Sequence, residues 1–218
     1  MRASFSTGVR ALGAVFMLCM SGALANSPFA ALTVVPTGGQ VFDIISGITT
    51  LPQGGTVTDQ DTGVALVAGH IEYRAQDYLE ASRVSLDGSF GHVTADVMRI
   101  DLKVGLLTAS GGLRLVREGL SVSADSLNFD ANAQVATFAG GVQSSDPSFV
   151  ADRVLLDVAS GDVLLEGEYV FEGGVFALRS PEGGGLLALK LVVSDGVTSY
   201  DAATEVAPEV LARFAPYL

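Results

Sequence analysis

Apolar and polar residues alternate in a repeated pattern through the middle of the chain. The segments Val93–Asp101, Val122–Asp130 and Phe149–Asp157 each place apolar side chains at steps of two, three and two residues. A step of two keeps side chains on one face of a β-strand, whereas a step of three keeps that face only where the strand bulges or turns a corner. The pattern therefore predicts bent strands that each bury one face.

An alanine and an aspartate mark the expected bend in each copy, at Ala95-Asp96, Ala124-Asp125 and Ala151-Asp152, which lie 29 and 27 residues apart. A weaker copy precedes them at Tyr78–Asp87, with Ser82 in place of the aspartate. A second kind of segment, in which a glycine comes before a new apolar alternation, falls between the copies at Leu106–Leu115, Val135–Gln143 and Val163–Phe171. Each repeat of about 28 residues is thus expected to hold two strands, with the small alanine inside and the aspartate near the corner.

One such unit cannot bury its apolar face alone, but stacked units share a continuous core. The sequence therefore predicts an all-β fold, a twisted β-jelly roll of about twelve to sixteen repeated antiparallel strands. We expect N-terminal strands of the roll within residues 26–65, at Gln40–Ile45 and Gly55–Asp59, and a repeat domain over residues 66–197. An acidic C-terminal tail over residues 198–218 is expected to hold one short helix near Pro208–Phe214.

The inner positions of the three copies form the candidate binding set. They are all apolar and comprise Val93, Ala95, Met98, Ile100, Val122, Ala124, Leu127, Phe129, Phe149, Ala151, Val154 and Leu156. The same alternation would suit either an apolar groove that holds a lipid or an ordinary dry core. The shape of the interior distinguishes the two, because a lipid site needs an open apolar lining.

The first 25 residues have the features of a secretory signal peptide. Arg2 and Arg10 give a basic start, residues 11–20 form an apolar run too short to span a bilayer, and Ala23-Leu24-Ala25 is a cleavage motif. We therefore expect cleavage after Ala25 and export; an uncleaved membrane anchor is the alternative. Cys19 is the one cysteine of the sequence, so cleavage would leave no thiol.

Charge and composition argue against several classes of function. Removing Arg2 and Arg10 changes the formal net charge from −12 to −14, which disfavours nucleic-acid binding. His70 and His92 are the two histidines, and neither lies in a nucleophile-elbow or paired-histidine metal motif. We expect a protein that is not an enzyme and uses no cofactor.

The aspartates of the repeats are the remaining candidate for chemistry. If the repeats are in register, Asp96, Asp125 and Asp152 form a column that could bind Ca²⁺ through carboxylate oxygens, or raise the pKa of one carboxyl for acid–base work. The alternative is structural, because aspartates at corners accept hydrogen bonds from backbone amides. The calcium-binding solenoid motif is absent from the sequence, which favours the structural role.

The paired motif resembles the OstA-like family, which includes LptA and LptC of periplasmic lipopolysaccharide transport. The resemblance covers about residues 66–180 and rests on ADVMRID with SGGLRL, ADSLNFD with AGGV, and ADRVLLD with EGEYVF. It implies a twisted roll, open along one side, whose interior cradles acyl chains and whose end strands pair edge to edge with other envelope proteins. Lys103, Arg114 and Arg117 are expected to form the one basic cluster that could meet a phosphorylated sugar head group.

The resemblance therefore implies a periplasmic lipid-binding or bridging protein with a ligand similar to lipopolysaccharide. A non-enzymatic structural protein of the envelope, assembling into homo-oligomers by edge-strand addition, is the alternative.

Overall fold

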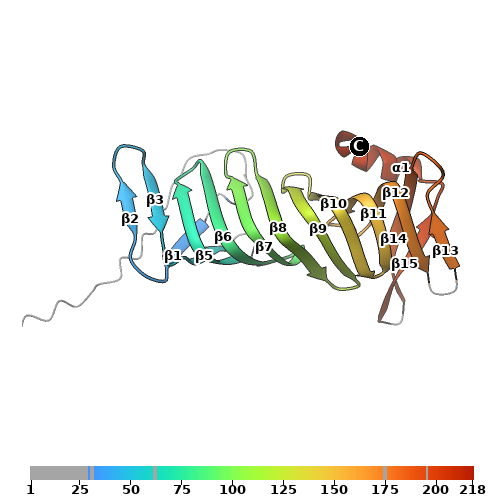
Figure 1. The fold of residues 1–218 in the computed structure, drawn as a ribbon, viewed down its shortest axis with the longest axis horizontal. Helices are drawn as coiled ribbons and strands as arrows, with labels where there is room; N and C mark the ends of the chain where they lie inside the picture. The colour runs from blue at the N-terminus through green and yellow to red at the C-terminus, as the bar shows by residue number, and fades with distance from the viewer. Residues whose placement is uncertain (1–28, 30–31, 61–62, 174–175, 195) are drawn as a thin grey trace, which may run out of the picture.

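The structure is a computed structural model that describes residues 29, 32–60, 63–173, 176–194 and 196–218. Within these residues the chain forms one antiparallel sheet of fifteen strands, which is not closed, and one short α-helix near the C-terminus (Figure 1). The all-β fold of repeated antiparallel strands is thereby confirmed. The signal peptide, its cleavage site and Cys19 lie outside the described residues.

Eight long strands make up the centre of the sheet, and each pairs with the next one along the chain. They are β5 (Val64–Arg74), β6 (Tyr78–Gly88), β7 (Gly91–Asp101), β8 (Leu106–Arg117), β9 (Leu120–Asp130), β10 (Val135–Asp146), β11 (Ser148–Asp157) and β12 (Val163–Gly173). Each repeat of the sequence corresponds to one hairpin, such as β7 with β8. Successive repeats therefore lie side by side in register, as the alternation predicts.

The two ends of the sheet are built from shorter strands. Before β5 come β1 (Leu32–Pro36), β2 (Val41–Asp43), β3 (Ile48–Leu51) and β4 (Gly55–Asp59). After β12 come β13 (Phe176–Arg179), β14 (Gly185–Ser194), β15 (Val197–Ala203), the helix α1 (Pro208–Phe214) and a 3-10 turn, η1 (Ala215–Tyr217). The expected boundary between residues 65 and 66 falls inside β5, so the sheet runs without interruption from the N-terminal strands into the repeats.

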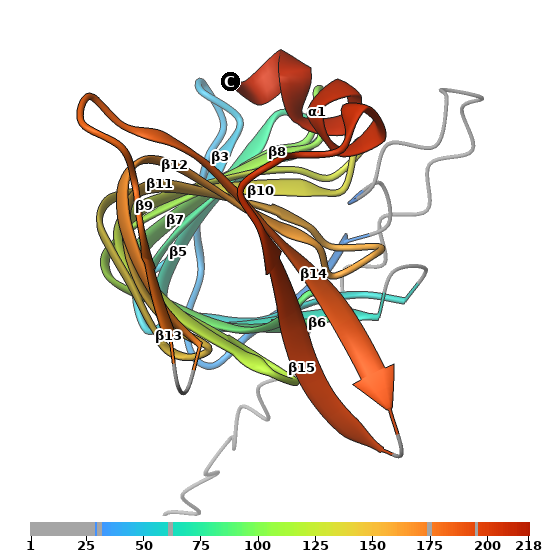
Figure 2. The ribbon, with the colours of Figure 1, turned by 90° about the vertical axis from the view of Figure 1, so that its right-hand side faces the viewer.

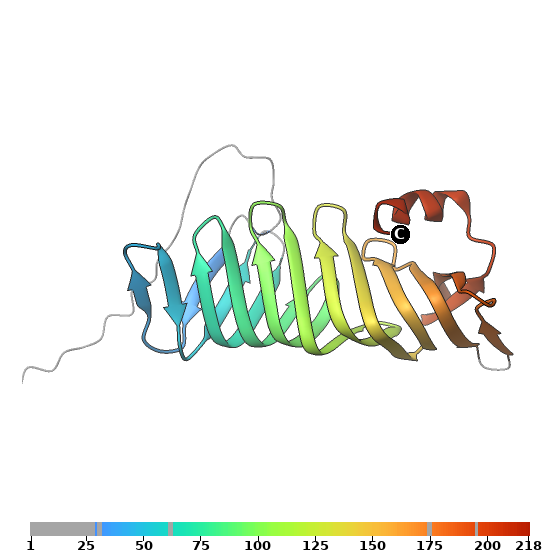
Figure 3. The ribbon, with the colours of Figure 1, turned by 45° about the horizontal axis from the view of Figure 1, so that its top comes forward.

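The long strands bend near their middles, and the sheet curls around an axis that crosses them, as the view along the roll shows (Figure 2; Figure 3 shows the strands side by side). The ladder shifts register at the bends, where Thr94–Val97 of β7 faces the longer segment Ser110–Arg114 of β8, and Ala151–Arg153 of β11 faces the longer segment Glu166–Tyr169 of β12. Such a bulge adds a residue to one strand and bends it. The predicted corner at each Ala-Asp pair is confirmed.

Each aspartate of the repeat packs against a glycine of the following strand. A Cβ placed on Gly111, Gly140 or Gly167 would lie 2.8 Å from the Cβ of Asp96, Asp125 or Asp152, respectively. The three glycines have φ of 74°, 79° and 88°, a left-handed conformation that side chains disfavour. At the third corner the amide of Glu168 donates a 2.6 Å hydrogen bond to Oδ2 of Asp152. Each corner therefore consists of an aspartate on one strand that faces a glycine on the next strand.

The C-terminal tail folds back on the outside of the roll. Phe214 of α1 is 1% exposed and packs with Val135, Leu155 and Leu164, which lie on the outer face of β10, β11 and β12. Nε of Arg213 donates to Oδ2 of Asp157 at 2.7 Å. The helix at residues 208–214 is confirmed, and it covers the apolar outer face of three strands. No helix within the described part of the chain has the length and apolar character needed to cross a membrane.

Candidate functional site

The structure brings the twelve candidate residues together on the inner face of the roll. Eleven of them are buried, Ala124 is half-buried, and all twelve belong to one apolar cluster. They come from β7, β9 and β11, and both halves of each strand contribute. The expectation that these side chains share a single interior is met. What they bind remains a prediction.

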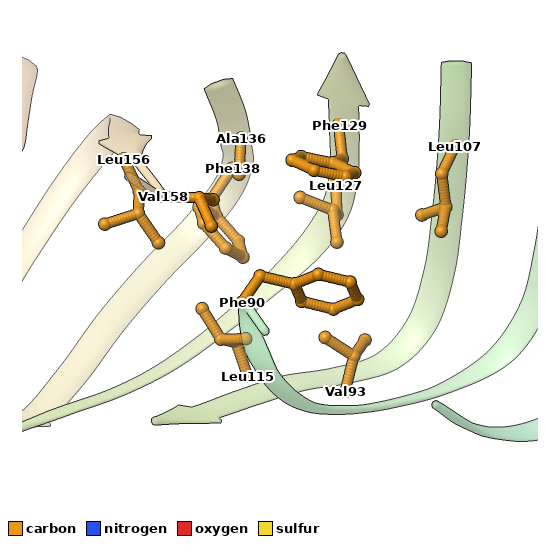
Figure 4. Close-up of a pocket in the computed structure, with 10 residues that line it drawn as sticks. All are labelled: Phe90, Val93, Leu107, Leu115, Leu127, Phe129, Ala136, Phe138, Leu156 and Val158. Carbon is orange, nitrogen blue, oxygen red and sulfur yellow. The ribbon is translucent and has the colours of Figure 1, made fainter. Parts of the chain in front are cut away.

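The interior is packed. An apolar cavity inside the roll, next to the turn residues Phe90 and Val158, has a volume of about 10 Å³, close to the smallest that can hold one water molecule. Ten apolar side chains line it, as Figure 4 shows, and four of them (Val93, Leu127, Phe129 and Leu156) belong to the candidate set. Sites for small organic ligands usually enclose roughly 300–1,000 Å³. By the criterion of shape, the interior is therefore that of a dry core rather than of an open groove. An alkyl chain could enter only if the walls moved apart.

Six of the residues that line the cavity are not in the candidate set. Leu107, Leu115, Ala136 and Phe138 lie on β8 and β10, the partner strands of the repeats. Their alternation is visible in the glycine-containing segments and could have identified them. Phe90 and Val158, by contrast, lie in turns, where no periodic signal exists.

The roll closes along one line, which we call the seam, where its two rows of hairpin turns approach each other. Phe90, in the turn between β6 and β7, contacts Phe129 near the opposite end of β9, with ring centroids 5.3 Å apart. Further along, Nη1 of Arg117 donates to the carbonyl oxygen of Val158 at 3.4 Å. The strand pairings of the described residues do not join the two rows of turns to each other. Side chains therefore hold the seam shut at these contacts.

The hairpin of β14 and β15 crosses the seam near the C-terminal end. Its first part pairs with β12, and the backbone amide of Leu191 then donates to Oδ1 of Asp162 at 3.3 Å. On the other row of turns, the hydroxyl of Thr198 donates to Oε1 of Glu118 at 3.5 Å. A Cβ on Gly119 would lie 2.5 Å from the methyl carbon of Thr198, so the absence of a side chain there permits the approach. This hairpin spans the seam from one row of turns to the other.

The aspartates of the repeats lie in a row but not within reach of one another. Asp96, Asp125 and Asp152 stand on β7, β9 and β11, with one strand between each pair. Because neighbouring strands are about 4.8 Å apart, the spacing along the row is near 10 Å. Calcium–oxygen distances are only about 2.4 Å. Among the described residues, no cluster of three or more histidine, aspartate, glutamate or cysteine side chains could hold a metal ion.

The three basic residues proposed for a head group do not form a cluster. Lys103 lies in the turn before β8 and pairs with Asp77 at 2.7 Å, whereas Arg117 lies at the far end of β8, on the opposite row of turns. Arg114 lies between them on the outer face, near Ser121. The expectation of one cluster was wrong because Arg117 meets the other row of turns at Val158, between β11 and β12, whereas Lys103 lies in the turn between β7 and β8, two hairpins away. His92 pairs with Asp87 at the exposed start of β7.

These features define a class of protein: an open antiparallel β-roll with an apolar interior and a seam closed by side chains. A comparison with models of protein families finds no match, and a comparison with curated proteins finds none.

Proposed function

We propose that this chain is a non-enzymatic lipid-binding and bridging protein of the bacterial periplasm, similar to components of lipopolysaccharide transport. Acyl chains would occupy the apolar interior of the roll. The observation that carries the proposal is the continuous apolar cluster, which extends along the curled sheet inside a seam that side chains hold shut. The resemblance of the repeats to the OstA-like family supports the same assignment.

Because the interior is packed, the proposed lipid site would form only when a ligand enters and the walls move apart. To admit a ligand, the seam must part, and Phe90, Phe129 and Val158 must give up their contacts. Burial of such side chains contributes about 2 kcal/mol each, so opening costs roughly 6 kcal/mol. An alkyl chain gains about 0.8 kcal/mol for each buried CH₂ group. Chains of roughly eight carbons or more would therefore offset the opening, and shorter ones would not.

Mass spectrometry of organic extracts of the purified protein tests the proposal directly. We expect co-purified molecules with alkyl chains, and we expect a series of n-alkyl probes from hexyl to tetradecyl to bind only beyond about eight carbons. A protein that carries no lipid and takes up none of the probes would refute the proposal.

A charge inside the roll should abolish binding, whereas the same charge outside should not. Phe129→Glu places a carboxylate in the interior, and Asn128→Glu places it one residue away on the exposed face of β9. Far-UV circular dichroism establishes that each variant is folded before probe binding is compared. Equal binding by two folded variants would contradict an interior site.

A second function is favoured by the ends of the sheet. Within the described residues, β1, β2, β13 and β15 each pair along one edge alone and leave the other free. Free edges can add strands from another molecule. We propose edge-to-edge pairing with other envelope proteins or with further copies of this chain. Sedimentation over a range of concentrations tests the homo-oligomer, and a strictly monomeric protein would exclude it.

A further inference from the structure

The hairpin of β2 and β3 presents an apolar tip at the N-terminal end of the roll (Figure 1). Ile44 and Ile45, in its turn, are 86% and 98% exposed, and Val41 and Phe42 on β2 are more than half exposed. Single exposed apolar residues are common on protein surfaces, but four within five positions form a local patch. Such a patch favours an interaction surface.

Hydrogen bonds hold the tip in this exposed conformation. The carboxylate of Asp43 accepts a 2.9 Å bond from the amide of Ile45 and a 2.8 Å bond from the hydroxyl of Ser46. The amide of Gly47 donates to the carbonyl oxygen of Asp43 at 2.8 Å. Because aspartate and serine fix the turn, the two isoleucines point away from the sheet instead of packing against it. Hydrogen bonds within the hairpin therefore fix the exposed position of the apolar tip.

The distribution of charge indicates what this tip can approach. Residues 11–58 include one charged side chain, Asp43, whereas residues 59–218 include 10 basic and 23 acidic residues, a formal net charge of −13. The acidic part repels an anionic lipid surface, and the N-terminal end does not. Within the described residues, the hairpin that bears the exposed isoleucines thus has a single charged side chain, Asp43, to oppose its approach to a lipid bilayer.

The shape of the hairpin favours the same partner. A protein partner must offer a groove that matches a projecting turn, whereas a fluid bilayer interface needs no complementary shape. A hollow of about 290 Å³ on the outer face of this chain is lined by Arg114, Gln143 and four serines, which do not suit two isoleucines. A second copy therefore offers no apolar receptor at that hollow.

We propose that the β2–β3 hairpin inserts its tip into a bilayer interface and orients the N-terminal end of the roll towards the membrane. The contact is shallow and reversible, since it uses a few apolar side chains without a basic patch to add electrostatic attraction. It does not depend on the binding of acyl chains inside the roll.

Sedimentation with phosphatidylcholine vesicles tests the insertion. We expect the wild-type chain to sediment with the vesicles and the double variant Ile44→Asn/Ile45→Asn to partition at least about tenfold less. Val104→Asn is the matched control, because Val104 is also an exposed apolar residue in a turn. Intact mass must show the same N-terminus in all three proteins, since the apolar run of residues 11–20 would bind vesicles if it were retained.

A fluorescent probe locates the contact. In a Cys19→Ser background, Ile45→Cys labelled with an environment-sensitive dye should shift to the blue when vesicles are added, and a label at Val193→Cys should not. The proposal would be overturned if the wild-type chain did not bind the vesicles, or if the double variant bound them as well as the wild type does. A shift that appears without vesicles as the protein concentration rises would also overturn it, because the occupant would then be a second copy.

Discussion

The contact between aspartate and glycine at the corners can be tested in β10, because this strand has two adjacent glycines and one of them alone faces an aspartate. Gly140 and Gly141 both adopt left-handed backbone conformations, with φ of 79° and 55°. A Cβ on Gly140 would lie 2.5 Å from Oδ2 and 2.8 Å from Cβ of Asp125, whereas a Cβ on Gly141 would meet nothing within 4 Å. Substituting alanine at the two positions therefore separates the cost of the backbone from the cost of the contact.

Alanine in a left-handed conformation costs roughly 1–2 kcal/mol at either position. Gly140→Ala adds a collision with Asp125, and overpacking of this kind costs about 1–3 kcal/mol. We expect Gly141→Ala to lower the free energy of unfolding by about 1–2 kcal/mol and Gly140→Ala by about 2–5 kcal/mol. Urea unfolding followed by far-UV circular dichroism measures both values.

The double variant Asp125→Gly/Gly140→Ala completes the test. Removing the aspartate side chain removes all three atoms that would lie within 3 Å of the new Cβ, so a favourable coupling energy of about 1–3 kcal/mol should appear in the double-mutant cycle. If the two single alanine variants differ by less than about 0.5 kcal/mol, or if the coupling is zero within that error, then steric contact at the corner is not what requires a glycine there.

Three further predictions concern the tail and the seam. Phe214→Ala should destabilise the protein by about 3 kcal/mol and speed proteolysis of the tail, whereas Leu218→Ala, at an exposed position, should do neither. Burial would raise the pKa of Asp157, but hydrogen bonds from Arg213 and from two backbone amides outweigh it, so this pKa is lowered in the folded protein. The stabilisation is therefore present above the unfolded pKa of about 3.9 and is lost as the pH falls through the lower folded pKa. Unfolding titrations should accordingly show Arg213→Gln less stable than the wild type by about 1 kcal/mol at pH 7 from the loss of this ion pair. The difference should narrow in strong acid to the contribution of the hydrogen bond from Arg213 to the carbonyl oxygen of Ala133, and a difference of the same size at both pH values would contradict the assignment. Phe90→Ala should enlarge the cavity and allow alkyl probes shorter than eight carbons to bind, which titration calorimetry measures.

The centre of the fold could be predicted because the same pattern of apolar positions occurs in three successive repeats. In β7, for example, Val93 and Ala95 precede the corner and Met98 and Ile100 follow it, and all four are buried. The step of three residues at Asp96 located the bend, and the extra residue of the bulge lies opposite it in β8. The register and the inner face follow from these positions, because a slip by one residue would expose the entire apolar set.

The docking of the tail was not predicted, although a signal for it exists. Leu155 and Leu164 break the alternation, and they turn runs such as VLL in β11 and β12 into strands that are apolar on both faces. A strand that is apolar on both faces is buried on both faces. The sequence therefore contained the information that something covers these strands, but the identity of the covering segment depends on the path of the chain after β15.

The seam could not be predicted from periodicity. Phe90 and Phe129 are 39 positions apart, and they meet because each intervening corner adds to the curl of the sheet. Val158 lies in a turn, where an apolar residue would ordinarily be exposed. Contacts of this kind depend on the accumulated curvature of several strands, which local patterns in the sequence do not specify.

The packed interior and the weakly joined seam lead to one physical conclusion about any lipid site. In a preformed groove, affinity would rise with the first carbon of the ligand, because no protein contact is lost. Here the contacts of the seam must be lost first, so affinity should rise only beyond a threshold chain length. The threshold scales with the apolar area that the seam buries, at about 25 cal/mol for each Å². Truncating a side chain at the seam should therefore allow shorter alkyl chains to bind, whereas truncating a residue on the outer face should leave the minimum chain length unchanged.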